Sequence, residues 1–280
     1  MKEVNVDIII ETIKELCIEA NYDITSDIYD SLCEAKKSET FELGKNIISD
    51  IILNSQIAKE ERVPICQDTG MACVFVEMGQ DVHIVGGNIN DAINEGVRRG
   101  YEEGFLRKSV VKDPINRVNT GDNTPALIYI DIVPGENIKL TVAPKGFGSE
   151  NMSQIKMLKP ADGIDGVKKF IIDVVREAGP NPCPPMVVGV GIGGSFDKAA
   201  YLAKKALIRP INKFNENEYY KELEIELLES MNKLGIGPQG FGGKTTALGL
   251  NIEVYPTHIA GLPVAVNINC HATRHADRVI

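Results

Sequence analysis

The sequence predicts a mixed α/β fold, with a helical N-terminal region followed by a glycine-rich α/β core. Apolar residues recur at helical spacing through residues 4–60. From residue 63 onward, short β-rich runs separated by glycine alternate with amphipathic helices. No internal repeat or low-complexity linker interrupts this pattern. We therefore expect one domain over residues 1–280, with a helical region at 1–60 and the α/β core at 61–280.

Start signals and periodicity locate the individual elements. Thr25-Ser26-Asp27 and Ser38-Glu39-Thr40 are typical of helix N-termini within the helical region. In the core we expect strands at 71–78, 81–85, 126–133, 138–143, 186–190, 251–254 and 264–268. We expect helices at 89–104, 165–178, 195–207 and 216–234.

Composition excludes several classes of function. The chain has 280 residues, of which 43% are hydrophobic, enough to bury a substantial core. No run approaches the ~18 apolar residues of a membrane span. The N-terminus carries acidic residues where a signal peptide would be basic and then apolar, so we expect a cytoplasmic protein with reduced thiols. A net charge of −9 argues against nucleic acid or an anionic membrane as the main partner.

The six cysteines fall into two groups. Three lie in turns rich in glycine, proline or polar residues: Cys66, Cys183 and Cys270. The other three lie on apolar helical or strand patterns, where a thiol serves as a small core residue: Cys17, Cys33 and Cys73. Three thiolates in turns can hold a cubane iron–sulfur cluster by three of its irons and leave the fourth open. Their wide spacing forms no local ligand motif, so the residues alone leave a structural role open.

Two glycine-rich stretches resemble nucleotide motifs without meeting them. Gly189–Gly194 has the spacing of a dinucleotide fingerprint, but residues 209–215 lack the strand and acid expected about 20 residues later. We expect these glycines to let the chain pass close to a cofactor. Gly240–Thr246 ends like a phosphate-binding loop, but Pro238 occupies the position of its first glycine.

A third glycine-rich turn could bind an anion. The turn Lys145-Gly-Phe-Gly-Ser149 exposes N–H groups beside a cation, which suits a carboxylate.

The histidines offer a second metal hypothesis. Cys270, His271 and His275 are close in sequence and could contribute to a zinc site, although direct neighbours rarely reach the same ion. His258 is expected at a turn between the last two strands.

Five motifs, taken in order, resemble one family. They are Cys66-Gln-Asp-Thr-Gly70, Asn119-Thr-Gly-Asp-Asn-Thr124, Lys145-Gly-Phe-Gly-Ser149, Cys183-Pro-Pro185 with Gly193-Gly-Ser195, and Thr257-His-Ile-Ala-Gly261 through Asn269-Cys-His-Ala272. Together they resemble the class I, iron–sulfur-dependent fumarate hydratases. The similarity is greatest to the α subunit of the two-subunit form, which is also similar to the α subunit of L(+)-tartrate dehydratase.

This resemblance implies a site and a reaction. It implies a [4Fe-4S] cluster held by Cys66, Cys183 and Cys270, with an open iron acting as a Lewis acid in the reversible hydration of fumarate to L-malate, a step of the tricarboxylic acid cycle. It implies a set of substrate-binding residues: Gln67, Asp68, Arg107, Gly148 and His258. Asp68 and His258 are also its candidate catalytic residues.

The resemblance also implies a partner. Single-chain members of the family carry a further domain that is similar to a separate β subunit and supplies the proton-abstracting residue. We therefore expect this chain to need a β subunit, as a homodimer within a heterotetramer. We expect the docking face to include Cys66, Cys270 and the turn Gly193–Ser195, with Arg274 and Arg278 at its rim. The alternatives are an L(+)-tartrate dehydratase subunit and a non-catalytic iron–sulfur or zinc-binding subunit such as a redox sensor.

Overall fold

A computed structural model describes residues 2–280 and confirms the mixed α/β class. The chain forms two compact units, each built from segments that are distant in sequence. The first unit comprises residues 2–25, 54–147 and 274–280, and the second comprises residues 26–53 and 148–273. The helical N-terminal region therefore contributes to both units.

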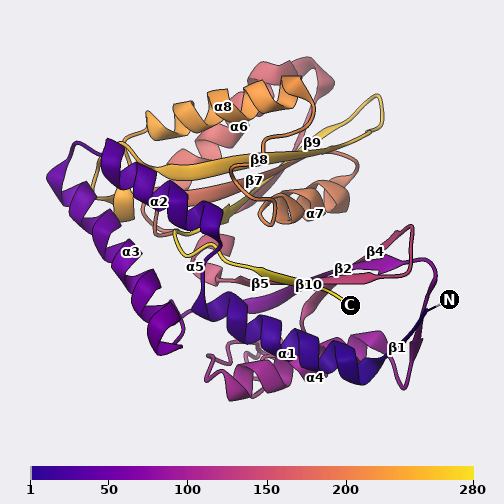
Figure 1. The fold of residues 1–280 in the computed structure, drawn as a ribbon. Coiled ribbons are helices and arrows are strands. Elements are labelled where there is room, and N and C mark those ends of the chain that lie inside the picture. The colour runs from indigo at the N-terminus through magenta and orange to yellow at the C-terminus, as the bar shows by residue number, and fades with distance from the viewer. Residues whose placement is uncertain (1) are drawn as a thin grey trace. The chain divides into compact units, whose positions relative to one another are not determined.

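The first unit contains a four-stranded mixed sheet with one helical layer (Figure 1). Its strand order is β10 (Ala276–Val279), β5 (Ile138–Lys145), β2 (Met71–Gly79) and β4 (Leu127–Val133). Strand β2 pairs in parallel with β4 and antiparallel with β5. Helices α1 (Val6–Tyr22) and α4 (Ile89–Glu103) pack side by side on the sheet. A short parallel pair, β1 (Lys2–Asn5) and β3 (Val82–Val85), completes the unit.

Helical periodicity explains how α1 packs. Ile9, Ile13 and Leu16 are fully buried, and the Asn5 side chain caps the helix by accepting a hydrogen bond from the Asp7 amide at 2.8 Å. Cys17 and Cys73 lie in the core of this unit, as expected, at 0% and 1% exposure. The same expectation was wrong for Cys33 of the second unit, which is only half-buried.

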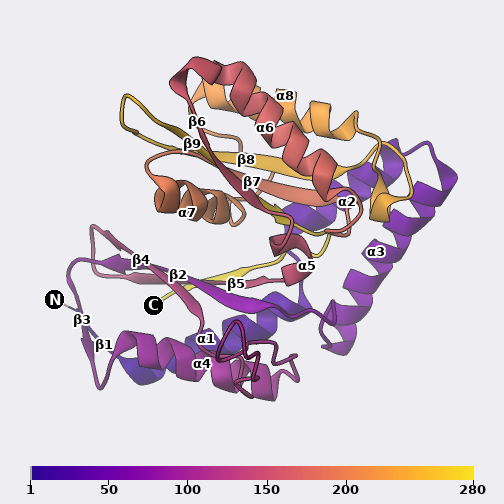
Figure 2. The same cartoon turned by 180° about the vertical axis from the view of Figure 1, so that it is seen from behind.

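The second unit contains the other four-stranded sheet (Figure 2). Its order is β6 (Gln154–Leu158), β9 (Leu262–Asn269), β7 (Met186–Gly193) and β8 (Ala247–Tyr255). Helices α6 (Gly163–Ala178) and α8 (Glu218–Asn232) cover one face, and α7 (Phe196–Ala206) covers the other. The remaining elements are α2 (Ser26–Ser38), α3 (Glu42–Glu61), α5 (Phe147–Glu150), η1 (Pro160–Asp162) and η2 (Pro238–Gly240). Residues of α3 and α5 fall in both units.

The glycines of β7 serve helix packing. A Cβ at Gly189 would lie 2.1 Å from the Ala203 carbonyl oxygen, and one at Gly191 would lie 2.1 Å from the Ala199 carbonyl oxygen. Only glycine allows α7 to approach the sheet this closely. We expected these two glycines to let the chain run close to a cofactor, but the space beside them is filled by α7, and that expectation is wrong.

Strands β1, β6 and β10 were not expected from the sequence. Strands β1 and β10 have four residues each, and β6 has the five-residue sequence QIKML with a single buried residue. Such short segments give only a weak local signal and depend on their sheet partners. No helix within residues 2–280 is long and apolar enough to cross a membrane.

Candidate functional site

In the first unit, Cys66 lies in an irregular loop between α3 and β2. The Cys66 side chain is half-buried, and the amide of Asp68 donates a hydrogen bond to its sulfur at 3.4 Å. The loop ends at Gly70, where φ is +68° and a Cβ would lie 2.4 Å from the Lys145 carbonyl carbon. Glycine is therefore required here both by the backbone conformation and by the close approach of β5.

The Asp68 carboxylate connects this loop to the glycine turn. Its Oδ1 accepts the Gly70 amide at 3.1 Å, and its Oδ2 accepts the Phe147 amide at 2.9 Å. Phe147 directly precedes Gly148, whose backbone is exposed. These bonds fix the orientation of the carboxylate, and its remaining lone pairs can still accept from a ligand. Gln67 is exposed on the same loop.

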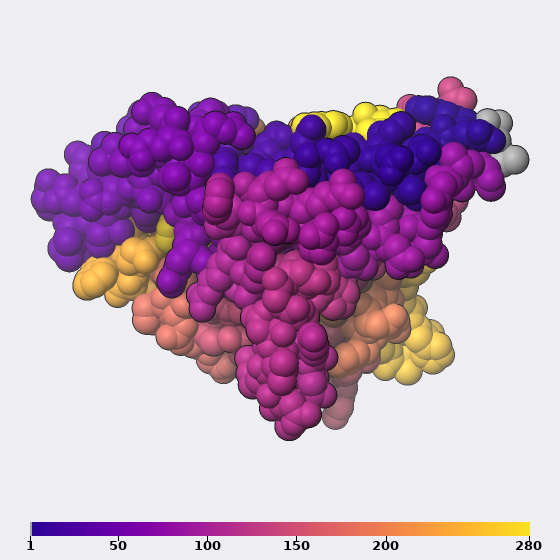
Figure 3. All heavy atoms as spheres, turned by 90° about the horizontal axis from the view of Figure 1, so that it is seen from below, coloured from indigo at the N-terminus to yellow at the C-terminus, as the bar shows by residue number. Residues whose placement is uncertain are grey.

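Arg107 is joined to the same loop through its backbone. Its amide donates to the Thr69 hydroxyl at 2.9 Å, and that hydroxyl donates to the Arg107 carbonyl at 3.2 Å. The Arg107 side chain is exposed and forms no salt bridge within residues 2–280. The segment between α4 and β4, which carries Arg107, projects from the first unit as the magenta lobe in Figure 3. Its guanidinium is thus available to a carboxylate.

In the second unit, Cys183 and Cys270 lie at the same end of the sheet. Cys183 precedes β7, and Cys270 follows β9, and these two strands are antiparallel neighbours. The His271 amide donates to the Cys183 carbonyl at 3.2 Å, and His271 Nδ1 lies 3.0 Å from the same oxygen. Cys183 adopts a φ of +52°, which is uncommon outside glycine and costs free energy.

The donor chemistry fits a thiolate-bound cluster. None of the six cysteines is in a disulfide, and the sulfur of Cys66 already accepts an N–H bond of the kind that tunes iron–sulfur ligands. Cys183 is exposed and Cys270 half-buried, whereas burial raises the pKa of the Cys17 thiol. A thiol kept protonated in the core is a poor ligand.

The structure groups the site residues by unit. Cys66, Gln67, Asp68 and Arg107 belong to the first unit, and Gly148, Cys183, His258 and Cys270 to the second. Within residues 2–280, no three His, Cys, Asp or Glu side chains are grouped as a metal site would require. Of the alternative zinc ligands, Cys270 and His271 belong to the second unit and His275 to the first. The three-thiol site stays a prediction.

His258 lies at the opposite end of its sheet from the two thiols of that unit. It occupies the turn between β8 and β9, as expected, and is exposed. Strand β9 has eight residues, so roughly 23 Å of extended chain separates this turn from Cys270. The Ala260 amide donates to His258 Nδ1 at 3.2 Å, which places the proton of the neutral ring on Nε2.

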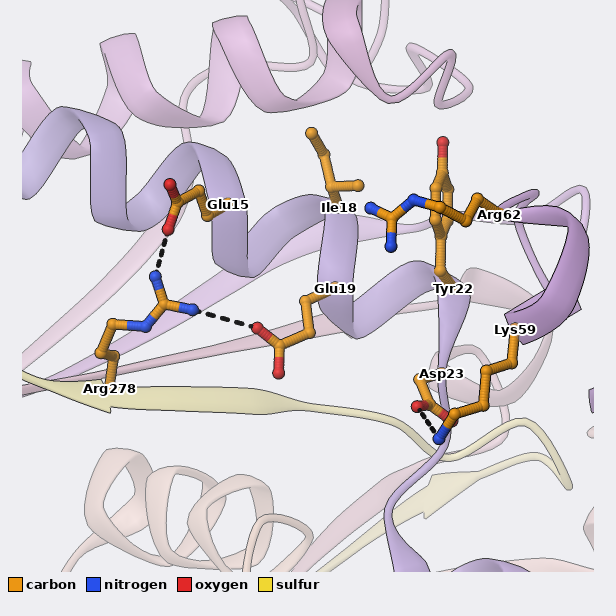
Figure 4. A pocket seen from close by; sticks show the side chains of 8 residues that line it. All are labelled: Glu15, Ile18, Glu19, Tyr22, Asp23, Lys59, Arg62 and Arg278. Atoms are coloured by element: carbon orange, nitrogen blue, oxygen red, sulfur yellow. Dashed lines mark hydrogen bonds and ion pairs between the residues drawn. The ribbon is translucent and has the colours of Figure 1, made fainter.

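The expected docking face is wrong in two respects. The turn Gly193–Ser195 lies with His258, because the Thr257 hydroxyl donates to the Gly194 carbonyl at 2.8 Å, and so it is distant from Cys270. Arg274 is only 4% exposed and cannot form a rim. Arg278 is half-buried and forms ion pairs with Glu15 and Glu19 at the edge of a 510 Å³ pocket (Figure 4).

Sequence reasoning missed the buried polar residues that hold the Cys66 loop. The Tyr101 hydroxyl donates to the Thr69 carbonyl at 2.7 Å, and Asn123 Nδ2 donates to the Gly70 carbonyl at 3.1 Å. Burial raises the pKa of Tyr101, which keeps its phenol protonated as a donor. The sequence could have identified Asn21, because a polar residue one helical turn after Cys17 falls on the apolar stripe of α1 and must be hydrogen-bonded there.

Comparison with known protein families accounts for the presence of these motifs in one chain. The family model described as fumarate hydratase (Fumerase) matches residues 10–279. The chain belongs to this family. This membership places the chain in a family of hydro-lyases and confirms the resemblance inferred from the five motifs.

Relatives within the family are similar along nearly the whole chain. A protein of Methanocaldococcus jannaschii with the provisional name L(+)-tartrate dehydratase subunit alpha is 44% identical, over 98% of this chain and 96% of its own. The L(+)-tartrate dehydratase subunit alpha of Escherichia coli strain UTI89 is 36% identical, over 90% and 86%. That of strain K12 is 34% identical, over 91% and 84%.

Proposed function

We propose that this chain is the α subunit of an iron–sulfur hydro-lyase that acts on a C4 dicarboxylate. In the leading form of the proposal it interconverts L-malate with fumarate and water. The proposal rests on the positions of three thiols in a chain of the Fumerase family. Cys66, Cys183 and Cys270 lie in turns outside the hydrophobic cores.

The proposed cofactor is a [4Fe-4S] cluster held by these three thiolates. When bound, the cluster would supply a Lewis acid that withdraws electron density from the substrate hydroxyl and eases its departure. Removal of water also requires transfer of a proton from the neighbouring carbon to a base. The names of the relatives contain "subunit alpha", which supports a partner subunit, and we assign the proton-abstracting base to that partner.

Four residues would bind the dicarboxylate, three from the first unit and Gly148 from the second. Arg107 offers an exposed guanidinium for a bidentate contact, and Gly148 offers a backbone amide in the short helix α5. Asp68, held by two backbone amides, would orient the hydroxyl, and Gln67 would donate its amide to a carboxylate.

His258 requires a separate assignment. Because β9 separates it from Cys270, His258 would serve a site on a second copy of the chain, as part of a homodimer within a heterotetramer. Ile259 in the same turn (90%) and Tyr255 at the end of β8 (53%) are exposed, and they offer an apolar surface suited to such a contact.

L(+)-tartrate is the second candidate substrate, supported by the names of the relatives. Tartrate and malate differ by one hydroxyl, and both lose water between adjacent carbons. Anaerobic reconstitution with iron and sulfide, followed by parallel assays of fumarate hydration and tartrate dehydration with and without a co-expressed β subunit, tests the proposal. We expect about four irons and four sulfides bound per chain, dependent on the three thiols, and turnover only in the two-subunit preparation. A reconstituted complex that binds no iron, or that turns over neither substrate, would contradict it.

A further inference from the structure

We propose that Arg274 is a positioning residue that holds the Cys66 loop in its ligand-binding conformation. This inference rests on the proposed function, because it concerns a thiol that we assign to the cluster. Arg274 lies four residues after Cys270 but belongs to the first unit, where only 4% of it is exposed. A buried guanidinium is costly unless hydrogen bonds to it compensate for the lost water.

The contacts of Arg274 show where that compensation comes from. Its Nη2 donates to the backbone carbonyl of Asp68 at 2.6 Å, a short charge-assisted bond. Its Nε donates to Asn21 Oδ1 at 3.2 Å, and Asn21 is itself completely buried. The guanidinium thus connects the loop to helix α1.

Asn21 holds the other end of the same loop. Its backbone carbonyl accepts the Ile65 amide at 2.9 Å, and its Nδ2 donates to the Cys17 carbonyl at 2.9 Å within α1. The Asn21–Arg274 pair therefore holds the loop on both sides of Cys66, at Ile65 and at Asp68. Since residues 63–70 form no helix or strand, these contacts take the place of a regular hydrogen-bond ladder.

The geometry suits arginine in particular. The planar guanidinium directs donors toward two acceptors on different segments, whereas a lysine ammonium is a compact charge on a flexible stem. A positioned Cys66 also places Asp68, because the two residues share this loop and the Asp68 amide contacts the Cys66 sulfur. Arg274 would act on both residues without touching the substrate.

Hydrogen exchange of the anaerobic apoprotein tests this role independently of catalysis. In Arg274→Met we expect the exchange of peptides covering 63–70 to rise about tenfold or more, because a charge-assisted bond to the loop is lost. Iodoacetamide should modify Cys66 correspondingly faster, while Cys17 and Cys73 in the core stay protected. Arg274→Lys should give an intermediate rate. Arg176→Met removes an exposed arginine from α6 and should change neither measurement.

Each outcome decides the inference. Unchanged exchange of 63–70 in folded Arg274→Met would overturn it, and so would an equal rise throughout the first unit, which indicates general destabilisation. If Arg274→Met does not fold, the Arg274→Lys variant decides by the same criterion. If wild-type protein takes up no iron, the proposed cluster fails while the effect on the loop stands. If it does take up iron and the loop is unaffected by Arg274→Met, only the role of Arg274 fails.

Discussion

The amide of His271 donates a hydrogen bond to the carbonyl of Cys183, 3.2 Å away, although 88 positions separate them in the chain. Antiparallel pairing of β7 with β9 produces this contact, because the start of one strand meets the end of the other. Two thiols that are far apart in sequence thereby reach the same end of one sheet.

The cysteine assignment predicts which substitutions abolish iron binding. Cys66→Ser, Cys183→Ser and Cys270→Ser should each lose most of the iron and sulfide after anaerobic reconstitution, because a hydroxyl is a poor replacement for a thiolate ligand. Cys33→Ser, on helix α2, is the matched control and should retain wild-type content. Iron and sulfide analysis with the visible absorption spectrum measures this. Full iron content in any of the first three variants would remove that residue from the ligand set.

Arg107→Ala should impair turnover far more than folding. The side chain is exposed and forms no salt bridge within residues 2–280, so its removal should change thermal stability little. Loss of one charged donor to a bound carboxylate should lower kcat/KM about 10²–10³-fold. Lys108→Ala removes the neighbouring exposed cation and should leave kcat/KM within a few-fold of wild type. Near-normal kcat/KM for Arg107→Ala in the reconstituted complex would refute the anchoring role.

The sequence predicted most helices and longer strands because these carry strong local signals. The apolar stripe that buries Ile9, Ile13 and Leu16 is visible as a 3.6-residue period, and it also placed Cys17 in the core. Turn context, in the same way, separated Cys66, Cys183 and Cys270 from Cys17 and Cys73 in the core, although Cys33 is only half-buried. Both inferences needed only residues close in sequence.

The remaining features depend on contacts between distant segments. Motif order could not show that His258 and Cys270 lie at opposite ends of β9, because a motif gives no distance. Arg274 was expected at the surface, as most arginines are, and its burial depends on Asn21, 253 positions earlier in the chain. Such pairings carry no periodic signal in a single sequence.

The contact between α1 and α4 predicts that alanine will destabilise the first unit at Gly100. A Cβ there would lie 2.7 Å from the Cys17 Cβ and 2.9 Å from the Lys14 carbonyl oxygen. Helix propensity alone would favour alanine by about 1 kcal/mol, but overpacking typically costs about 1–3 kcal/mol. We therefore expect a net loss, measured as a lower Tm. Gly261→Ala meets only ordinary contacts at 3.7 Å or more and is the control. An unchanged or higher Tm for Gly100→Ala would show that α1 and α4 separate easily.

The cluster of charges on α4 predicts a pH-dependent contribution to stability. A hydrogen bond from Arg98, with further bonds and charge from Arg99, lowers the pKa of Glu95 to about 2 from its ordinary 4.5. A lowered folded-state pKa gives stability that is present above pH 4.5 and lost as pH falls toward 2. Glu95→Gln should therefore cost about 0.5 kcal/mol at pH 7, and less at pH 3. Urea titration at both values measures this. Glu34→Gln, in an ion pair exposed on both sides, is the control and should cost nothing measurable. A cost that does not shrink at low pH would exclude the ionised Glu95 as its source.

Mixing two inactive variants tests whether His258 acts in a second copy of the chain. Within its own unit, His258 lies roughly 23 Å of strand away from Cys270, so a histidine that contacts substrate must come from elsewhere in the assembly. Cys66→Ser and His258→Ala should each be inactive as homodimers. When the two chains are co-expressed with the β subunit, about half of the dimers are mixed, and each mixed dimer contains one site with an intact thiol and an intact histidine. Activity should then recover to about a quarter of wild type.

The opposite result has an equally clear meaning. If His258 acts within its own chain, both sites of every mixed dimer are defective and no activity returns. Native mass spectrometry confirms that mixed dimers form, so that a lack of recovery contradicts the assignment and does not reflect failed assembly.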